Sequence, residues 1–357
     1  MVSNPLFNNS INGVALPLCL WGGFRFSDIV VTFLKAQPHV AGMVSLDDIR
    51  SAHSRIQESI VKTPVMTSTT INRIVGCDVY FKCENFQKVG AFKFRGALNA
   101  VLQLTKDEKE RGVIAHSSGN HAQALALAAK ICDVKSVIVM PDNSPTVKVE
   151  ATKGYGAEVV FCASTVESRV ETATKLVDEF QYTLVHPYDN DHIIAGAGTA
   201  AFELISEIGT CDVILAPVGG GGLLSGTSIA TKGLLPDSLV IAVEPENADD
   251  AFRSIRDGIL YPSVQPDTIA DGLRTSLSER TFRIIKQHVD RIVTVSEDEI
   301  LNSMRLLWER MKIVVEPSGA VSLAGLIKLH EEVSGKKIGV IISGGNIDLS
   351  DFFDSFK

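Results

Sequence analysis

The sequence lacks the features that mark several large classes of protein. It has no apolar run long enough to cross a bilayer, no CxxC pair, no internal repeat and no low-complexity tract. Its formal net charge of −8 is unfavourable for binding nucleic acid or an anionic membrane surface. We therefore expect neither a nucleic-acid partner nor a membrane partner.

The composition favours a globular protein with a large hydrophobic core. Its 357 residues are 45% hydrophobic, which is enough for the core of two domains or of one large domain. Several cysteines lie inside apolar runs, which favours buried free thiols in a reducing compartment and predicts a cytoplasmic location. The six cysteines are Cys19, Cys77, Cys83, Cys132, Cys162 and Cys211.

Residues 1–43 differ from the remainder of the chain. The apolar stretch GVALPLCLWGGF is short, contains a proline, follows no basic segment and precedes no clear cleavage site. We favour a disordered or mis-annotated leader. A targeting peptide is the alternative, because Asp28 is the only acidic residue before Asp47.

From residue 44 onwards, apolar runs typical of strands alternate with helical periods. Helices are predicted over 120–131 and 166–180, and strands at DVYFKCE, GVIAHS, SVIVMP, EVVFCA, DVILAPV, LVIAVEP and KIGVIISGG. This alternation predicts an α/β fold with largely parallel strands covered by helices. Ligands of such sheets bind at the carboxyl ends of the strands, so functional residues are expected there.

Lys93 lies in an unusual place, between two phenylalanines in the stretch GAFKFRGA. Burial disfavours the charged form of a lysine, and a neutral amine is a nucleophile that can form a Schiff base. On these residues alone, an ordinary surface lysine is the favoured interpretation.

Two strand ends carry residues suited to binding anions. The glycines of GGGGLLSG, residues 219–222, precede a helix start and would let backbone N–H groups approach a phosphate monoester. Neither GxGxxG nor GxxxxGK[ST] is present there, and a flexible turn is the alternative. Residues 117–120 (SSGN) stand at another helix start and would suit a carboxylate, although Asn120 could be a plain N-cap.

Two further strand ends carry polar side chains. Ser343 in SGGN could hydrogen-bond a ring nitrogen, with a helix-capping serine as the alternative. Glu244, Asp249 and Asp250 in EPENADD offer oxygen ligands for Mg²⁺, Mn²⁺ or Ca²⁺, with an acidic, solvated helix start as the alternative. A lysine, a phosphate loop, a carboxylate site and a serine for a ring nitrogen together indicate a pyridoxal-phosphate amino-acid enzyme.

The chain from about residue 44 to its end resembles the serine/threonine dehydratase and serine racemase family. The motifs ENFQKVGAFKFRGALNAV, SSGNHAQAL, PVGGGGLLSG, EPENADD, TIADGL, EPSGA and SGGNIDL match it in order. The resemblance implies a two-domain fold type II pyridoxal-phosphate enzyme, similar to the tryptophan synthase β subunit, and a homodimer. It implies a large domain of residues 44–111 and 190–357 and a small domain of residues 112–189.

The resemblance also assigns roles to residues. Lys93 would be the Schiff-base lysine and Ser118 the second catalytic group, while Glu316 falls near the cofactor. The cofactor-binding set would be Phe92, Lys93, Asn120, Gly219, Gly220, Gly221, Gly222, Leu223, Gly272 and Ser343. The substrate set would be Ser117, Ser118, Asn120, His121 and Arg169. The divalent-cation set would be Glu244, the Ala248 carbonyl and Asp250.

A nucleotide site is implied with one mismatch. Members of the family bind ATP as an activator, and the matching positions here are Lys88, Gln123, Lys148, Tyr155 and Asn346. Val89 replaces a threonine, which puts activation by ATP in doubt, and Tyr188 replaces an asparagine.

The resemblance implies a serine racemase that also eliminates water from L- or D-serine to give pyruvate and ammonia. The alternatives are a threo-3-hydroxyaspartate dehydratase giving oxaloacetate and ammonia, and a threonine dehydratase. Outside this class, a catalytically silent ligand-binding protein on the same fold is a further alternative.

Overall fold

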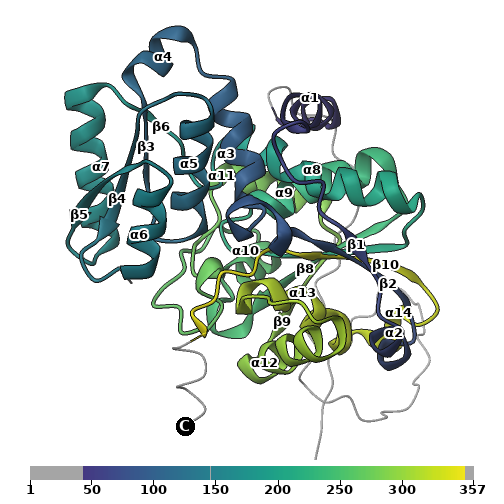
Figure 1. Cartoon of the computed structure of the whole chain (residues 1–357). Helices are drawn as coiled ribbons and strands as arrows, with labels where there is room; N and C mark the ends of the chain where they lie inside the picture. Colours follow the sequence, from purple (N-terminus) through teal and green to yellow (C-terminus); the bar gives the residue numbers. More distant parts are fainter. Residues whose placement is uncertain (1–42, 145, 350–357) are drawn as a thin grey trace, which may run out of the picture. The chain divides into compact units, whose positions relative to one another are not determined.

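The computed structural model describes residues 43–144 and 146–349, which contain two β-sheets (Figure 1). In the larger sheet the first strand is antiparallel to its neighbour and every other pair is parallel. Its order is β1 (Val65–Met66), β2 (Asp78–Cys83), β10 (Lys337–Ile342), β7 (Val213–Pro217), β8 (Leu239–Pro245) and β9 (Arg291–Val295).

The smaller sheet is wholly parallel. Its order is β5 (Glu158–Cys162), β4 (Ser136–Pro141), β3 (Val113–His116) and β6 (Thr183–Leu184). All four strands fall inside the predicted small domain, residues 112–189. The domain boundaries themselves stay a prediction.

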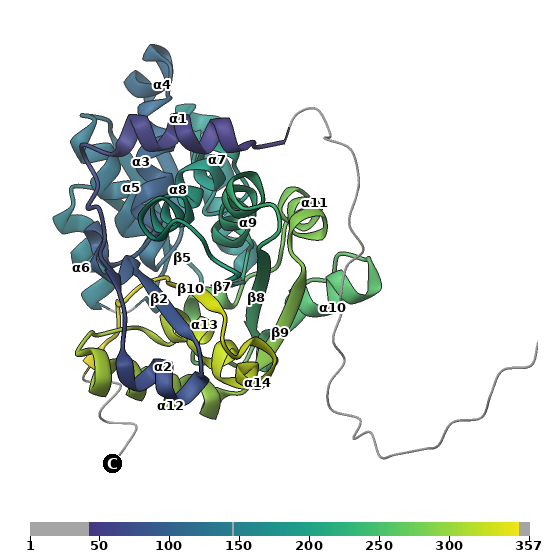
Figure 2. The same ribbon diagram turned by 90° about the vertical axis from the view of Figure 1, so that its right-hand side faces the viewer.

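Helices cover both sheets, as parallel strands require. Figure 2 shows α8 (Asp191–Ile208) and α9 (Gly222–Leu234) on one side of the larger sheet, and α12 (Glu297–Leu306) and α13 (Pro317–Lys328) on the other. In Figure 1, α7 (Val166–Phe180) lies on one side of the smaller sheet. The other side carries α5 (Asn120–Ile131) and α6 (Thr146–Gly154).

The remaining helices are shorter or lie outside these layers. The α-helices are α1 (Leu46–Ile56), α2 (Thr69–Val75), α3 (Lys93–Leu102), α4 (Lys106–Arg111), α10 (Asp250–Asp257), α11 (Glu279–His288) and α14 (His330–Val333). The 3₁₀ turns are η1 (Glu84–Phe86), η2 (Lys88–Gly90), η3 (Glu246–Ala248) and η4 (Asp271–Leu273), and η5 (Leu307–Met311) is a π-helix.

Each strand predicted from an apolar run is present, and the two predicted helices have the predicted bounds. Sequence reasoning missed β1, β6 and β9. The first two have only two residues each, too few to show a pattern, and β9 (RIVTV) begins with an arginine. The predictions about residues 1–43 lie almost wholly outside the described residues.

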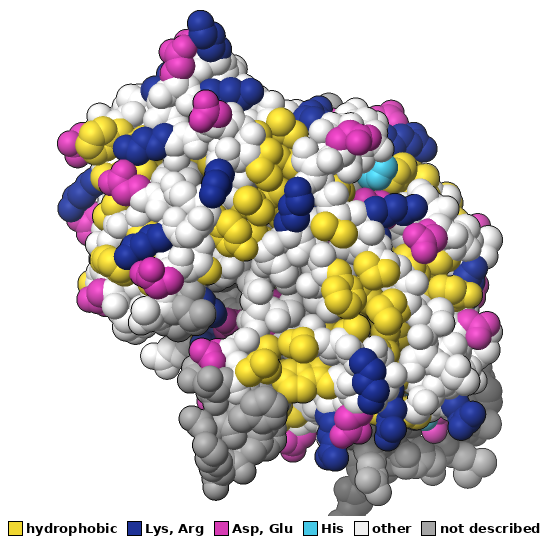
Figure 3. All heavy atoms as spheres, viewed as in Figure 1, with side chains coloured by type: hydrophobic (Ala, Val, Ile, Leu, Met, Phe, Trp, Pro, Cys, Tyr) yellow, Lys and Arg dark blue, Asp and Glu magenta, His cyan; other side chains and the backbone are white. Residues whose placement is uncertain are grey.

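The described cysteines agree with the prediction of free thiols. None is in a disulfide; Cys77, Cys83, Cys162 and Cys211 are buried, and Cys132 is partly exposed. No helix among the described residues is long and apolar enough to cross a membrane. On the face shown in Figure 3, acidic and basic side chains are interspersed.

A buried cluster of charged residues joins α3 to the larger sheet and to α8. Arg95 donates to both carboxylate oxygens of Glu84, at 2.6 and 2.8 Å, and to both of Glu203, at 2.8 and 2.9 Å. Lys82 lies 2.7 Å from Glu203, so two cations face two anions. Because the cluster is almost fully buried, each charge depends on its partners.

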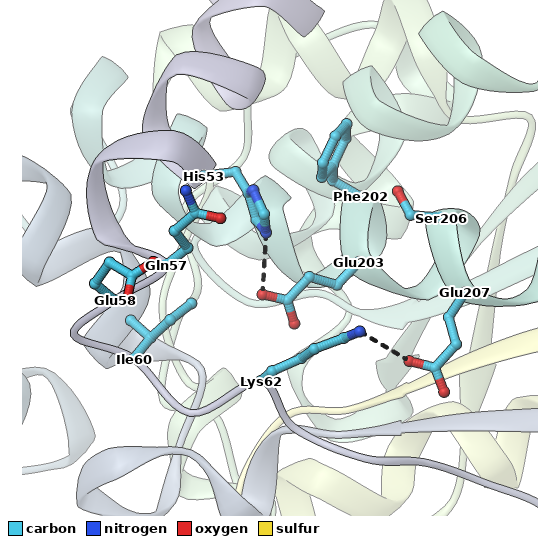
Figure 4. Close-up of a pocket in the computed structure, with 9 residues that line it drawn as sticks. All are labelled: His53, Gln57, Glu58, Ile60, Lys62, Phe202, Glu203, Ser206 and Glu207. Atoms are coloured by element: carbon cyan, nitrogen blue, oxygen red, sulfur yellow. Dashed lines mark ion pairs between the residues drawn. The ribbon is translucent and has the colours of Figure 1, made fainter.

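The outer end of this cluster reaches a surface pocket of about 320 Å³ between α1 and α8 (Figure 4). There His53 Nε2 lies 3.6 Å from Glu203, and Lys62 pairs with Glu207 at 4.0 Å. The pocket therefore marks where the cluster meets solvent.

Replacing Arg95 with methionine should lower the free energy of unfolding by about 3–5 kcal/mol, because two buried carboxylates lose their main partner. Urea unfolding measures this, with Arg50→Met as the control. Arg50 forms an exposed ion pair with Asp47, so its loss should cost about 1 kcal/mol or less. Equal losses for both variants would contradict the role given to the cluster.

Candidate active site

The four glycines form a packed loop between β7 and α9, not a free turn. A Cβ on Gly219 would lie 2.8 Å from Leu273 Cα, and a Cβ on Gly220 would overlap the ring of Tyr188. Gly221 has a φ of 86° and stands at the N-cap of α9, where no described side chain accepts a hydrogen bond from the helix. The N–H groups of the first turn are therefore available to an anion.

Lys93 is partly buried at the first residue of α3. Its amine donates a hydrogen bond to the Pro187 carbonyl at 2.9 Å and lies 5.1 Å from the centre of the Phe92 ring. Burial lowers the pKa of Lys93 to about 8, against the opposing effect of Glu316. At mildly alkaline pH a substantial fraction of this amine is therefore neutral and nucleophilic.

The predicted ring-binding residues meet beside Lys93. The Phe92 N–H donates to the Ser343 carbonyl at 3.0 Å, and the Ser343 hydroxyl donates to the Ser318 carbonyl at 3.2 Å. The Gly272 N–H in turn donates to the Ser318 hydroxyl at 3.1 Å. The alternative that Ser343 caps a helix is wrong, because no helix begins in the residues that follow it, 344–348.

The SSGN segment leads into α5 without a side-chain cap among the described residues. Gly119 is the N-cap, and the Ser117 hydroxyl accepts from the Gly119 N–H at 3.3 Å. The Ser118 hydroxyl makes no hydrogen bond with any described residue. Asn120 donates to both oxygens of Glu316, at 2.9 and 3.2 Å, so the N-cap alternative for Asn120 is wrong.

Glu316 connects Asn120 to the end of the described chain. It accepts a hydrogen bond from the Asn346 N–H at 3.1 Å, and Asn346 donates to Asn120 at 2.8 Å. Burial, followed by the negative charge of Asp271, raises the pKa of Glu316 to about 7. Asn346 also donates to the carbonyl of Val89, a β-branched residue held at a φ of 56°.

Sequence reasoning missed two histidines, His116 and His186, that lie near His121 of the predicted substrate set. The rings of His116 and His186 lie 6.0 Å apart, and His186 contacts Tyr188 edge-on at 4.6 Å. His121 donates from Nε2 to the Val185 carbonyl at 2.8 Å, which makes it a buried structural residue. Burial lowers the pKa of His121 to about 3 and of His186 to about 4, so both are neutral at pH 7.

Arg169 projects from α7 in the neighbourhood of His116, whose pKa is lowered by burial and then by the Arg169 charge. Helix α7 also carries acidic residues that could pair with Arg169, but the ion pair found on this helix joins Lys175 to Glu171. Arg169 forms no ion pair with any described residue. Its charge is therefore available to an anionic ligand.

The predicted cation site is buried, which contradicts a solvated helix start for Glu244 and Asp250. Glu244 accepts hydrogen bonds from the N–H groups of Ala251 and Phe252, at 2.9 and 2.8 Å. Both oxygens of Asp250 are buried without a hydrogen-bond partner among the described residues. Burial raises the pKa of Asp250 to about 6, against the opposing effect of the Arg253 charge.

No group of three or more His, Cys, Asp or Glu side chains within residues 43–144 and 146–349 is arranged to hold a metal ion. The predicted set differs from such a group, because its third ligand is the backbone carbonyl of Ala248. The unpartnered Asp250 oxygens fit a divalent cation.

The structure joins only some of the predicted nucleotide-binding residues by direct contacts. Asn346 lies close to Lys88, because it donates a hydrogen bond to the carbonyl of Val89, the next residue in the chain. Lys148 is engaged in an ion pair with Asp271 at 2.9 Å. Gln123 is buried on α5, which contacts the η2 turn that contains Lys88, and Tyr155 packs against the hydrophobic cluster that includes α5. The nucleotide site stays a prediction.

These features define a class of protein. A nucleophilic lysine, a glycine loop at a helix start and a serine beside an aromatic ring occupy one edge of an α/β fold. The protein is thus built as an enzyme that holds a phosphorylated ring compound next to an amine.

Comparison with known proteins identifies the family. Residues 56–344 match the family described as "Pyridoxal-phosphate dependent enzyme". A serine racemase of Dictyostelium discoideum is 49% identical over 311 residues, covering 86% of this chain and 96% of that protein. An L-threo-3-hydroxyaspartate ammonia-lyase of Saccharomyces cerevisiae is 48% identical over 306 residues, covering 85% and 94%.

Solved structures agree with the sequence matches. A crystal structure of serine racemase from Dictyostelium discoideum superimposes with a TM-score of 0.83 at 48% identity, covering 85% of this chain and 99% of that one. The chain belongs to the pyridoxal-phosphate dependent enzymes, with the α/β architecture of fold type II and relatives that are racemases and ammonia-lyases. Its cofactor is pyridoxal phosphate, which fits the uncapped glycine loop and the amine of Lys93.

The uptake of pyridoxal phosphate by cofactor-free protein should depend on pH through Lys93. Only the neutral amine reacts with the cofactor's aldehyde, so the rate should rise about tenfold per pH unit below pH 8 and level off above it. Stopped-flow absorbance measures this rate, and Lys93→Ala should show no imine absorbance. A rate that keeps rising to pH 10 would mean that the lysine has an ordinary pKa.

Proposed function

We propose that the protein is a serine racemase that also eliminates water from serine to give pyruvate and ammonia. The observation that carries the proposal is the pair of groups beside the predicted cofactor position: the amine of Lys93, with its lowered pKa, and the unbonded hydroxyl of Ser118. Racemisation needs a proton donor and a proton acceptor on opposite sides of Cα.

When bound, pyridoxal phosphate would supply an electrophilic aldehyde and an electron sink for the bond broken at Cα. Lys93 would take the α-proton, and Ser118 would hold the proton on the other face. The N–H groups at the start of α5 would bind the α-carboxylate, with Asn120 oriented by Glu316. The glycine loop and Leu223 would hold the phosphate, Phe92 and Gly272 would enclose the ring, and Ser343 would contact its nitrogen.

A dehydratase acting on threo-3-hydroxyaspartate is the second candidate. It is supported by Arg169, whose guanidinium has no acidic partner among the described residues and lies near His116. A cation in that position suits a second carboxylate on the substrate. Threonine dehydratase and a silent ligand-binding protein are the remaining alternatives.

A substrate panel tests the proposal. Holoenzyme is assayed with L-serine, D-serine, L-threonine and threo-3-hydroxyaspartate for keto acid and for inversion of Cα. Inversion of serine supports the racemase, and keto acid from hydroxyaspartate alone supports the second candidate. A protein that shows the cofactor's visible band, lost on borohydride treatment, but turns over none of the four is a silent binder.

Ser118→Ala should abolish racemisation of serine while elimination from L-serine survives in part. Lys93 still takes the α-proton of L-serine, whereas the α-proton of D-serine faces away from it. Elimination from D-serine should therefore fall sharply. Chiral chromatography with a keto-acid assay measures both, and racemisation at the parent rate would mean that another group serves this face.

Arg169→Ala should weaken binding of threo-3-hydroxyaspartate or malonate at least about tenfold more than binding of serine. Loss of a charge-assisted hydrogen bond weakens the binding free energy by about 1.5–3 kcal/mol. Serine has no second carboxylate, so its binding should not depend on this bond. Inhibition constants and KM values give the comparison, with Lys175→Ala on the same helix as the control. Equal losses for serine and the dicarboxylates would exclude the role in specificity.

We also infer a divalent-cation site at Glu244, the Ala248 carbonyl and Asp250. Chelation should lower the melting temperature by about 1–2 °C for each kcal/mol of lost binding, and Mg²⁺ or Mn²⁺ should restore it. Asp250→Asn should not respond to either treatment. Unchanged melting of exhaustively chelated parent protein would refute the site.

The other expectations belong to the same proposal. A homodimer and a cytoplasmic location follow from the family resemblance and from the free thiols. A nucleotide bound by Lys88, Gln123, Lys148, Tyr155 and Asn346 would have to displace the ion pair of Lys148 with Asp271 or extend it.

A further inference from the structure

Tyr188 lies against the glycine loop, although it belongs to the segment between β6 and α8. A Cβ on Gly220 would overlap its ring, and a Cβ on Gly222 would lie 2.9 Å from the Tyr188 Cβ. Its neighbour Pro187 accepts the hydrogen bond from Lys93. One short segment thus contacts both the amine and the backbone that would hold the phosphate.

The ring of Tyr188 is held in place from the other side. His186 packs edge-on against it, with ring centres 4.6 Å apart and planes at 86°. The His186 ring is itself oriented, because its Nδ1 accepts from the Asp189 N–H at 2.9 Å. Asp189 then pairs with Arg280 of α11 at 2.7 Å. These contacts leave the Tyr188 ring little freedom to move away from the loop.

The predicted cation site adjoins the same loop. Strands β7 and β8 are parallel with Pro217 opposite Val243, so Gly219 and Glu244 leave neighbouring strands at one edge of the sheet. Burial raises the pKa of Tyr188 to about 12, and the negative charges of Asp189 and Asp250 add to the effect. The phenol is therefore neutral and lies within the field of the unpartnered Asp250 carboxylate.

We propose that Tyr188 is a positioning residue shared by the glycine loop and the Glu244–Asp250 site, and that through it pyridoxal phosphate and a divalent cation favour each other's binding. The proposal rests on the cofactor and cation assignments made above. A buried Asp250 carboxylate without a hydrogen-bond partner among the described residues repels a phosphate dianion on the loop, and a cation bound to it weakens that repulsion. The aromatic ring keeps water out of the space between them, so the charges interact in a low dielectric.

Linkage makes the effect measurable from either ligand, because each must change the other's affinity by the same factor. Cofactor-free protein is titrated with pyridoxal phosphate, with excess Mg²⁺ and after chelation, and the dissociation constant is read from cofactor absorbance. In the parent protein, Mg²⁺ should lower this constant about 5- to 10-fold, within the usual range of coupling.

Variants at position 188 decide whether the ring carries the coupling. Tyr188→Phe keeps the ring and should keep the Mg²⁺ effect. Tyr188→Ala admits water, which screens the charges, and should reduce the effect to less than twofold while weakening cofactor binding overall. Tyr188→Asn serves in place of alanine if that variant does not fold, with the same expected loss, because the shorter polar side chain also admits water.

Tyr80→Ala is the matched control. Tyr80 is also partly buried, but it lies on β2, two strands away from β7. It should keep the full Mg²⁺ effect. A parent protein without the effect, or a Tyr188→Ala variant that retains it, overturns the proposal.

The Asp250→Asn variant distinguishes a wrong role for Tyr188 from a wrong cofactor site or a wrong cation site. If the parent binds no pyridoxal phosphate, or if Asp250→Asn responds to Mg²⁺ as the parent does, the cofactor or cation site is wrong and the coupling falls with it. If Asp250→Asn has lost the effect and Tyr188→Ala has kept it, both sites stand and only the role of Tyr188 is refuted.

Discussion

The buried charge cluster around Arg95 is the constraint on which the site depends. Arg95 follows Lys93 by two residues in the first turn of α3, and its guanidinium is bound by Glu84 after β2 and by Glu203 of α8. Moving any of these elements would leave a charge in the core without a partner, which is far more costly than losing an apolar contact. The start of α3, and with it Lys93, is therefore fixed relative to the larger sheet.

A series of direct contacts connects Lys93 to the glycine loop and to the predicted ring-binding residues. The amine bonds Pro187, the next residue Tyr188 packs on Gly220, and Gly219 packs on Leu273. The adjacent Gly272 connects through Ser318 to Ser343 and from there back to Phe92. Six segments far apart in the chain are thus joined by one continuous set of contacts. A change in one segment should be felt by the others, because closely packed backbone cannot adjust locally.

More of the fold than of the candidate site could be predicted from the sequence. Parallel strands buried on both faces appear as apolar runs, so β2, β3, β4, β5, β7, β8 and β10 were predictable, whereas the two-residue β1 and β6 were not. Motif matching listed the predicted cofactor residues only in their order along the chain. It could not show that Ser118 is unbonded, that Asp250 lacks a partner or that Arg169 has no ion pair, since each depends on which distant residues come close. His116, His186 and Ser318 were missed for the same reason.

By itself the sequence determined the α/β class, the strand ends that carry the candidate functional residues, and the membership in a pyridoxal-phosphate family. The first two follow from local hydrophobic periodicity, and the third follows from short motifs. The tertiary structure alone decided which alternative held for each side chain. Glu244 and Asp250 are buried instead of solvated, and Ser343 and Asn120 bond inside the fold instead of capping helices. The lowered pKa of Lys93 is likewise a property of its surroundings. Burial, charge pairing and hydrogen bonding arise between residues that only folding brings together, so no local pattern can specify them.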